Sequence, residues 1–161
     1  MSSILDLINN LDRSKKILVI GHKKPDTDTI FSSYLMSKVL QSLGYDALYA
    51  VLDGEKISED CTKQVMDNFD YSPFILDKKD IFKYNYFLTD HNDVNQSIED
   101  ASLVLGAIDH HPDAGMVNVI VTSYVSTCLA IYDMCSSFYD FSDYETVSYT
   151  HLRAHETEAD L

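Results

Sequence analysis

Histidine and aspartate residues gather at three places in this sequence, and each place directly follows a short apolar run. The stretches "GHKKPDTDT", "TDH" and "IDHH" contain His22, Asp26, Asp28, Asp90, His91, Asp109, His110 and His111. Mixed nitrogen and oxygen donors suit Mn²⁺, Fe²⁺, Co²⁺ or Zn²⁺, whereas an all-oxygen set would suit Mg²⁺ or Ca²⁺. Carboxylates brought together destabilise a fold unless a cation compensates their charge. The three groups together therefore predict two metals that share a bridging carboxylate, an arrangement used for phosphoryl hydrolysis.

Each group taken alone has a purely structural explanation. The first can be a polar turn in which Asp28 caps the following helix. An Asp-His pair after a strand is often no more than loop polarity. What favours a metal centre is the position that all three groups share, at the ends of strands.

The elements that position these groups are read from apolar runs and their periodicity. Strands are expected over 16–21, 46–52, 84–90, 103–109 and 118–123. Helices are expected over 3–12, 29–44, 58–69 and 125–139. This alternation predicts an α/β fold, with a mostly parallel sheet flanked by helices. Ligands of such sheets bind outside the carboxyl ends of the strands, where all three groups fall.

Composition limits the classes of partner. The 161 residues are 45% hydrophobic and 24% charged, which is typical of one globular domain. A formal net charge of -14 argues against binding to nucleic acid or to a membrane surface, so an anionic substrate needs a local positive centre. Three cysteines without C-x-x-C spacing, and no targeting or membrane-spanning segment, indicate a cytoplasmic location.

Three motifs in order, "GHKKPDTDT", "TDHNDVNQS" and "AIDHH", resemble the family II, manganese-dependent inorganic pyrophosphatases of the DHH phosphoesterase superfamily. The resemblance covers residues 16 to about 140. It implies that His22 and Asp26 bind a first metal and that Asp28 and His110 bind a second. It implies further that Asp90 bridges the two.

The same resemblance implies the remaining roles. His111 would face the phosphate and donate a hydrogen bond or a proton, while Asp109 would orient the histidines and His91 and Asn92 would have supporting roles. A hydroxide that bridges two Mn²⁺ ions, with Co²⁺ or Mg²⁺ as possible replacements, would split pyrophosphate into two phosphates. Family members commonly dimerise through a sheet edge, so a homodimer of the full-length protein is possible.

The sequence also departs from the family pattern. The resemblance implies a fourth carboxylate in a Ser-Asp-Thr context and a second domain whose lysines and arginine clamp the substrate. Asp143, in "FSDYE", superficially resembles that motif, but it lies in a polar stretch directly after the expected helix and is not assigned as the fourth carboxylate. We therefore expect residues 1–146 to be an incomplete DHH-type domain, truncated before its last strand and inactive alone. Residues 147–161, with "SYTHLRAHE", resemble a translated adapter read and are expected to be a non-native tail.

Two other functions remain open at the level of sequence. One is a phosphodiesterase or phosphatase of the same superfamily that acts on short oligonucleotides or nucleotides. Such members typically have Gly between the two aspartates, and this chain has Thr27 there. The other is a non-catalytic metal-binding module.

Overall fold

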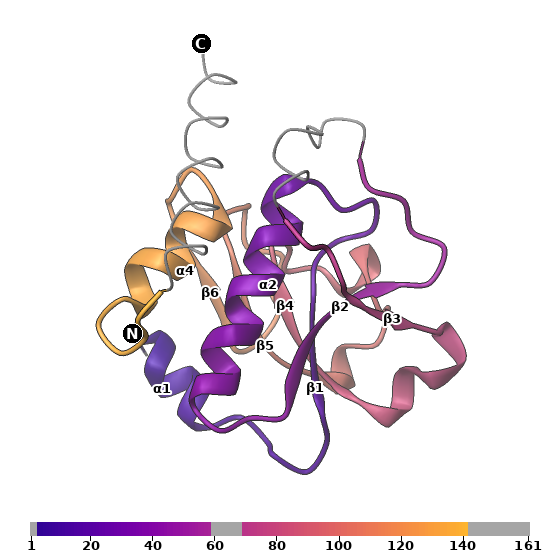
Figure 1. Ribbon diagram of the computed structural model, residues 1–161, viewed down its shortest axis with the longest axis horizontal. Helices are drawn as coiled ribbons and strands as arrows, with labels where there is room; N and C mark the ends of the chain where they lie inside the picture. Colours follow the sequence, from indigo (N-terminus) through magenta and orange to yellow (C-terminus); the bar gives the residue numbers. More distant parts are fainter. Residues whose placement is uncertain (1–2, 59–68, 142–161) are drawn as a thin grey trace.

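A computed structural model of the chain describes residues 3–58 and 69–141. The helix expected over 58–69 falls almost wholly outside these residues, and the expected tail, 147–161, falls entirely outside them. The described part is an α/β fold built on one six-stranded sheet (Figure 1).

Every strand pair in this sheet is parallel, and the strand order is β3-β2-β1-β4-β5-β6. The strands are β1 (Ile17–Ile20), β2 (Ala47–Leu52), β3 (Phe74–Leu76), β4 (Asn85–Thr89), β5 (Val104–Asp109) and β6 (Val119–Val121). The predicted fold class is thus confirmed, and five of the six strands lie where apolar runs predicted them. The sequence analysis missed β3, because three residues at a sheet edge are too short to form a pattern.

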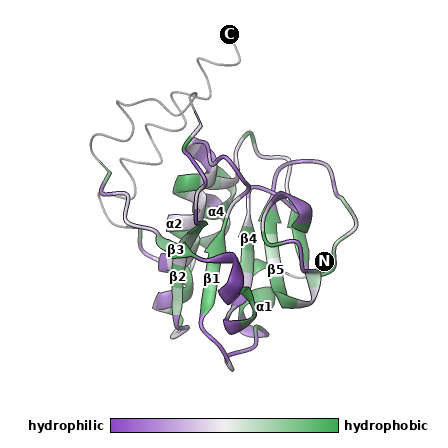
Figure 2. Ribbon diagram, turned by 90° about the vertical axis from the view of Figure 1, so that its right-hand side faces the viewer, coloured by the Kyte–Doolittle hydropathy of each residue, from purple (hydrophilic) through white to green (hydrophobic). Residues whose placement is uncertain are grey.

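The three α-helices of the described residues cover one face of the sheet (Figure 1). They are α1 (Ile4–Asn9), α2 (Thr27–Ser42) and α4 (Thr127–Cys135). The opposite face carries the 3₁₀ turns η1 (Lys78–Lys83), η2 (Val94–Gln96) and η3 (Ala101–Leu103). Strand side chains alternate between two cores, so Ile17 and Val19 face the helices while Leu18 and Ile20 face away. Burial on both faces explains why the strands are mostly apolar, as the predominantly green colouring of β1 and β5 in Figure 2 shows.

The connections place a topological switch beside β1. The chain runs outward from β1 to β2 and β3, then returns to the other side of β1 to form β4 and β5. The carboxyl ends of β1, β4 and β5 are therefore neighbours, and the histidine and aspartate groups follow these three strands. Crevices at such switch points are where open parallel sheets bind their ligands.

The helix that follows β1 is capped by Asp26, whose Oδ1 accepts a hydrogen bond of 2.9 Å from the Thr29 amide. The structural alternative with Asp28 as this cap is therefore wrong. Asp28 instead accepts bonds of 2.9 Å from the amides of Thr127 and Cys128, which open α4. The two aspartates thus serve two different helices.

No helix within residues 3–58 and 69–141 is long and apolar enough to cross a membrane.

Close approach of β1 and α2 depends on Gly21. A Cβ atom at this position would lie 1.9 Å from Cγ2 of Thr29, so the side chain of Thr29 or the helix that carries it would have to shift. We predict that Gly21→Ala lowers the free energy of unfolding by about 1–3 kcal/mol, as overpacking does. Chemical denaturation with a chelator present measures this.

A double variant provides the control. Thr29→Ser removes the clashing Cγ2 atom, so adding it to Gly21→Ala should recover part of the loss. Wild-type stability of the single Gly21→Ala variant would contradict the packing argument.

Candidate metal centre

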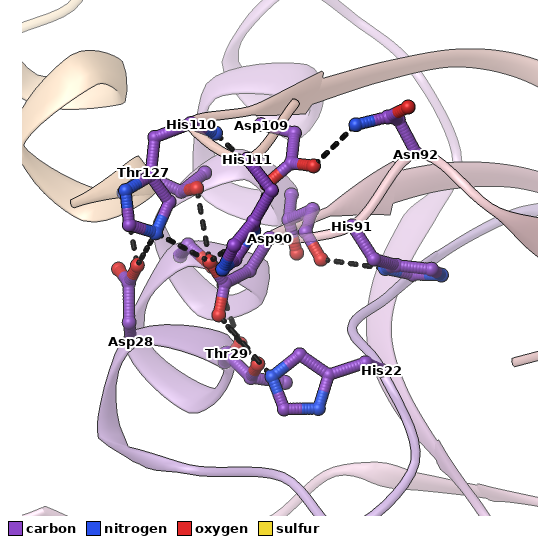
Figure 3. Close-up of polar contacts among 12 residues, drawn as sticks. His22, Asp28, Thr29, Asp90, His91, Asn92, Asp109, His110, His111 and Thr127 are labelled. Atoms are coloured by element: carbon purple, nitrogen blue, oxygen red, sulfur yellow. Dashed lines mark hydrogen bonds and ion pairs between the residues drawn. The ribbon is translucent and has the colours of Figure 1, made fainter. Parts of the chain in front are cut away.

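Asp90 lies at the middle of the site and is only 2% exposed. Its Oδ2 accepts a hydrogen bond of 2.8 Å from the Thr29 hydroxyl and lies 3.4 Å from Nε2 of His22. Its Oδ1 accepts a bond of 3.2 Å from the Thr127 hydroxyl and lies 3.2 Å from Nε2 of His110. The two oxygens therefore face two different groups of side chains (Figure 3).

The first group consists of His22, Asp26 and Asp90, whose potential ligand atoms all lie within 4.8 Å of one another. Nε2 of His22 is 3.5 Å from Oδ2 of Asp26. Nδ1 of His22 lies 2.8 Å from the carbonyl oxygen of Lys23 and therefore donates its hydrogen there. This tautomer leaves the lone pair of Nε2 available to a cation.

The second group surrounds Oδ1 of Asp90. Nε2 of His110 lies 3.4 Å from Oδ2 of Asp28, which is 6% exposed. Asp109 and His111 also place potential ligand atoms within 4.8 Å of those of Asp90 and His110. The described part of the chain thus offers two sets of donors that share one carboxylate.

The carboxylate of Asp109 is already engaged on both oxygens. Oδ1 accepts bonds from the amide of His110 at 2.8 Å and from Nδ1 of His111 at 2.7 Å, and Oδ2 accepts one from Asn92 at 2.6 Å. Because Asp109 is fully buried, these contacts fix the "DHH" turn. They suit Asp109 to orienting the histidines, and they direct Nε2 of the half-exposed His111 away from Asp109.

His91 and Asn92 are buried behind the site. Nδ1 of His91 donates to the carbonyl of Thr89 at 2.9 Å, and Nε2 lies 2.8 Å from the Ser97 hydroxyl. Burial lowers the pKa of His91, which favours the neutral ring. Both ring nitrogens are engaged in the two hydrogen bonds just described. Asn92 joins two loops, because it bonds to Asp109 and also accepts from the amide of Ala114 at 2.6 Å.

The electrostatics of the metal-free chain indicate a need for positive charge. Burial, reinforced by the nearby charge of Asp90, raises the pKa of Asp28 well above its ordinary value. Burial would also raise the pKa of Asp90, but hydrogen bonds with His110 and His22 hold it well below its ordinary value. Burial opposes protonation of His22, yet hydrogen bonds with Asp26 and Asp90 raise its pKa to about 11. A donor set that retains protons in this way fits divalent cations, which would replace them.

A cavity of about 310 Å³ adjoins the two donor sets. It is lined by His22, His91, Asn92, Asp93, Gln96, Asp109, His111, Pro112 and Ala114. No lysine or arginine belongs to this lining among the described residues, so its positive charge would have to come from cations or from histidine.

The sequence analysis did not predict the side-chain contacts that two threonines make with Asp90. The hydroxyls of Thr29 and Thr127 bind Asp90, and threonine in the first turn of a helix carries no signal that separates this role from capping. All residues that it did single out at the three strand ends lie in or directly behind the centre.

The fold and the two donor sets define a class: α/β proteins that carry a divalent-metal centre at the switch point of a parallel sheet. A family model described as "DHH family, N-terminal domain" matches residues 16–157, and the chain belongs to this family.

Two curated relatives show which proteins this chain is similar to. The chain is 39% identical over 99 residues to a probable manganese-dependent inorganic pyrophosphatase of Exiguobacterium sp., covering 59% of this chain and 31% of the relative. It is 37% identical over 100 residues to the manganese-dependent inorganic pyrophosphatase of Bacillus subtilis, covering 60% of this chain and 31% of that protein. The chain therefore spans about a third of the length of these relatives.

A solved structure supports the fold. An exopolyphosphatase-related protein from Bacteroides fragilis superposes with a TM-score of 0.63 at 20% identity, covering 91% of this chain and 46% of that chain.

Metal binding should release protons. His22 has an ordinary pKa of 6.5 that is raised to about 11, so between these values the metal-free folded chain retains a proton that a ligand must lose. We predict that Mn²⁺ binding at about pH 7.5 releases at least one proton per chain and that affinity rises with pH across this window. Calorimetry in buffers of different ionisation enthalpy counts the protons.

His22→Gln is the matched control, because it cannot contribute this proton. Release that is unchanged in His22→Gln, or absent in the wild-type chain, would contradict the assignment of the raised pKa to His22.

Proposed function

We propose that this domain is the metal-binding half of an enzyme that hydrolyses inorganic pyrophosphate to two phosphates. The observation that carries the proposal is the pair of donor sets that share the carboxylate of Asp90. Its support comes from membership of the DHH family and from relatives that are named as manganese-dependent inorganic pyrophosphatases.

Residue roles follow from the direction of each donor. His22 and Asp26, which face Oδ2 of Asp90, would hold a first cation, and Asp28 and His110, which lie on the side of Oδ1, would hold a second. Asp109 orients the two histidines that follow it, with His91 and Asn92 behind.

The metals proposed are two Mn²⁺ ions, because imidazole combined with carboxylate suits Mn²⁺ better than it suits Ca²⁺ or Mg²⁺. Co²⁺ fits the same donors, and Mg²⁺ is a weaker replacement. When bound, such cations lower the pKa of water and neutralise phosphate charge.

His111 is the residue proposed to act on the substrate itself. Its ring lies beside the cavity of about 310 Å³. With Nδ1 donating to Asp109, Nε2 is the nitrogen that can donate a hydrogen bond or a proton to a phosphate oxygen in that cavity. Asp109 thus keeps the imidazole in the orientation that proton transfer requires.

In our proposal residues 1–146 alone lack the positive charge that hydrolysis of pyrophosphate requires. The chain carries a formal net charge of -14, and the described lining of the cavity holds no lysine or arginine. Pyrophosphate would need additional cationic side chains, which we assign to a substrate-clamping domain outside residues 1–146. In this proposal residues 147–161 are a non-native tail. The proposal also includes a cytoplasmic location and a homodimer of the full-length protein.

Two measurements test the function. The 161-residue chain with Mn²⁺ should release little phosphate from pyrophosphate. A chimera that joins residues 1–141 to the remaining part of the Bacillus subtilis relative should hydrolyse pyrophosphate, and should prefer it to a dinucleotide by at least about tenfold.

Asp90→Asn in this chimera should lower turnover by at least about a hundredfold, because both donor sets lose their shared carboxylate. Asp46→Asn is the matched control, since Asp46 lies at the amino end of β2, where it pairs with Lys16. Robust turnover by the 161-residue chain alone would refute the need for a second domain. Preference for the dinucleotide would instead indicate a phosphodiesterase.

A further inference from the structure

Two threonines repeat one pattern of contacts on opposite sides of the site. Each lies in the first turn of a helix, and each is almost completely buried, with Thr29 3% exposed and Thr127 0% exposed. Each donates its backbone amide to one carboxylate and its side-chain hydroxyl to another. The carboxylate that receives both hydroxyls is Asp90.

On the side of α2, the amide of Thr29 donates to Oδ1 of Asp26 at 2.9 Å. The hydroxyl of the same residue donates to Oδ2 of Asp90 at 2.8 Å. Thr29 thus links two carboxylates: that of Asp26, which belongs only to the first donor set, and that of Asp90, whose Oδ2 faces this set. Cγ2 of Thr29 occupies the space that a Cβ atom at Gly21 would need, so this position of Thr29 depends on the glycine.

On the side of α4, the amide of Thr127 donates to Oδ2 of Asp28 at 2.9 Å. Its hydroxyl donates to Oδ1 of Asp90 at 3.2 Å. The second donor set is therefore linked to the other oxygen of Asp90 in the same way. Figure 3 shows Thr29 and Thr127 approaching Asp90 from different elements.

An ionised carboxylate has about four lone-pair directions, two on each oxygen. One hydroxyl on each oxygen occupies one direction and leaves another for a cation. Because both oxygens are held, Asp90 cannot rotate toward one donor set at the expense of the other. The orientation of the Asp90 carboxylate is therefore fixed by α2 and α4. These helices share one core, with side chains such as Phe31, Leu35 and Ile131.

We propose that Thr29 and Thr127 are paired positioning residues, each of which holds one unshared carboxylate and one oxygen of Asp90, so that each threonine controls the metal on its own side. This rests on the proposed two-metal function and adds a specific assignment to it. Thr29 governs the cation at His22 and Asp26, and Thr127 governs the cation at His110 and Asp28.

The test measures Mn²⁺ affinity one site at a time in the full 161-residue chain. His110→Ala removes a donor from the second set and leaves the first. In that background Thr29→Val should weaken Mn²⁺ binding by about tenfold to a hundredfold, as loss of an orienting contact does, while Thr127→Val should change it less than about threefold. In a His22→Ala background the two effects should exchange. Calorimetry and Mn²⁺ electron paramagnetic resonance give the affinities.

Threonine to valine replaces the hydroxyl with a methyl group of similar shape and keeps the backbone amide, so Asp26 and Asp28 retain their bonds. Thr29→Ser and Thr127→Ser keep the hydroxyl and should retain affinity within about threefold, which separates orientation from packing. If a valine variant fails to fold with a chelator present, the serine variants test the role of the hydroxyl instead. A large loss of Mn²⁺ affinity in folded Thr29→Ser or Thr127→Ser would overturn that role.

Equal weakening of both sites by either valine variant, or no weakening, would overturn the pairing even though the wild-type chain binds two Mn²⁺ ions. Failure of the wild-type chain to bind Mn²⁺ at all would overturn the metal assignment on which the pairing depends. The two failures are therefore distinguishable.

Discussion

The structure depends on one buried negative charge, the carboxylate of Asp90. It is 2% exposed, it lies at the end of a central strand, and its backbone adopts the left-handed conformation with a φ of 62°. Two imidazoles and two threonine hydroxyls surround it. Burial, reinforced by the nearby charge of Asp90, raises the pKa of Asp28. A buried carboxylate beside a second carboxylate is stable only with compensating positive charge. Divalent cations supply that charge in the function proposed here, and protons supply part of it in their absence.

The sheet topology is what brings these groups together. The carboxyl ends of β1, β4 and β5 are adjacent because the chain reverses direction across the sheet between β3 and β4. Two helices then begin at this edge, and their first-turn amides donate to Asp26 and Asp28. The amino ends of helices favour negative charge, so α2 and α4 stabilise the carboxylates that a metal centre needs. Asp26 and Asp28 are only two positions apart in sequence, but they accept hydrogen bonds from the amides of different helices.

Much of this arrangement could be predicted from the sequence. Buried parallel strands give apolar runs, continuous in β1 and centred on Tyr86, Phe87 and Leu88 in β4. Three groups of histidine and aspartate after such runs are expected to meet at one edge of the sheet. Other features could not be predicted. The strand β3 is three residues long, and the cap of α2 could have been either of two aspartates. The contacts of Thr29, Asn92 and Thr127 join segments up to 99 residues apart. Some of these contacts resemble ordinary helix capping at the level of sequence, and only the folded arrangement distinguishes the two roles.

The most direct test is to locate the metals themselves. Crystals of the chain grown with Mn²⁺ and measured at the manganese absorption edge should show two anomalous peaks on opposite sides of the Asp90 carboxylate. One peak should lie beside His22 and Asp26, and the other beside His110 and Asp28. A single peak, or a peak between Asp109 and His111 with Asp90 unbound, would contradict the account.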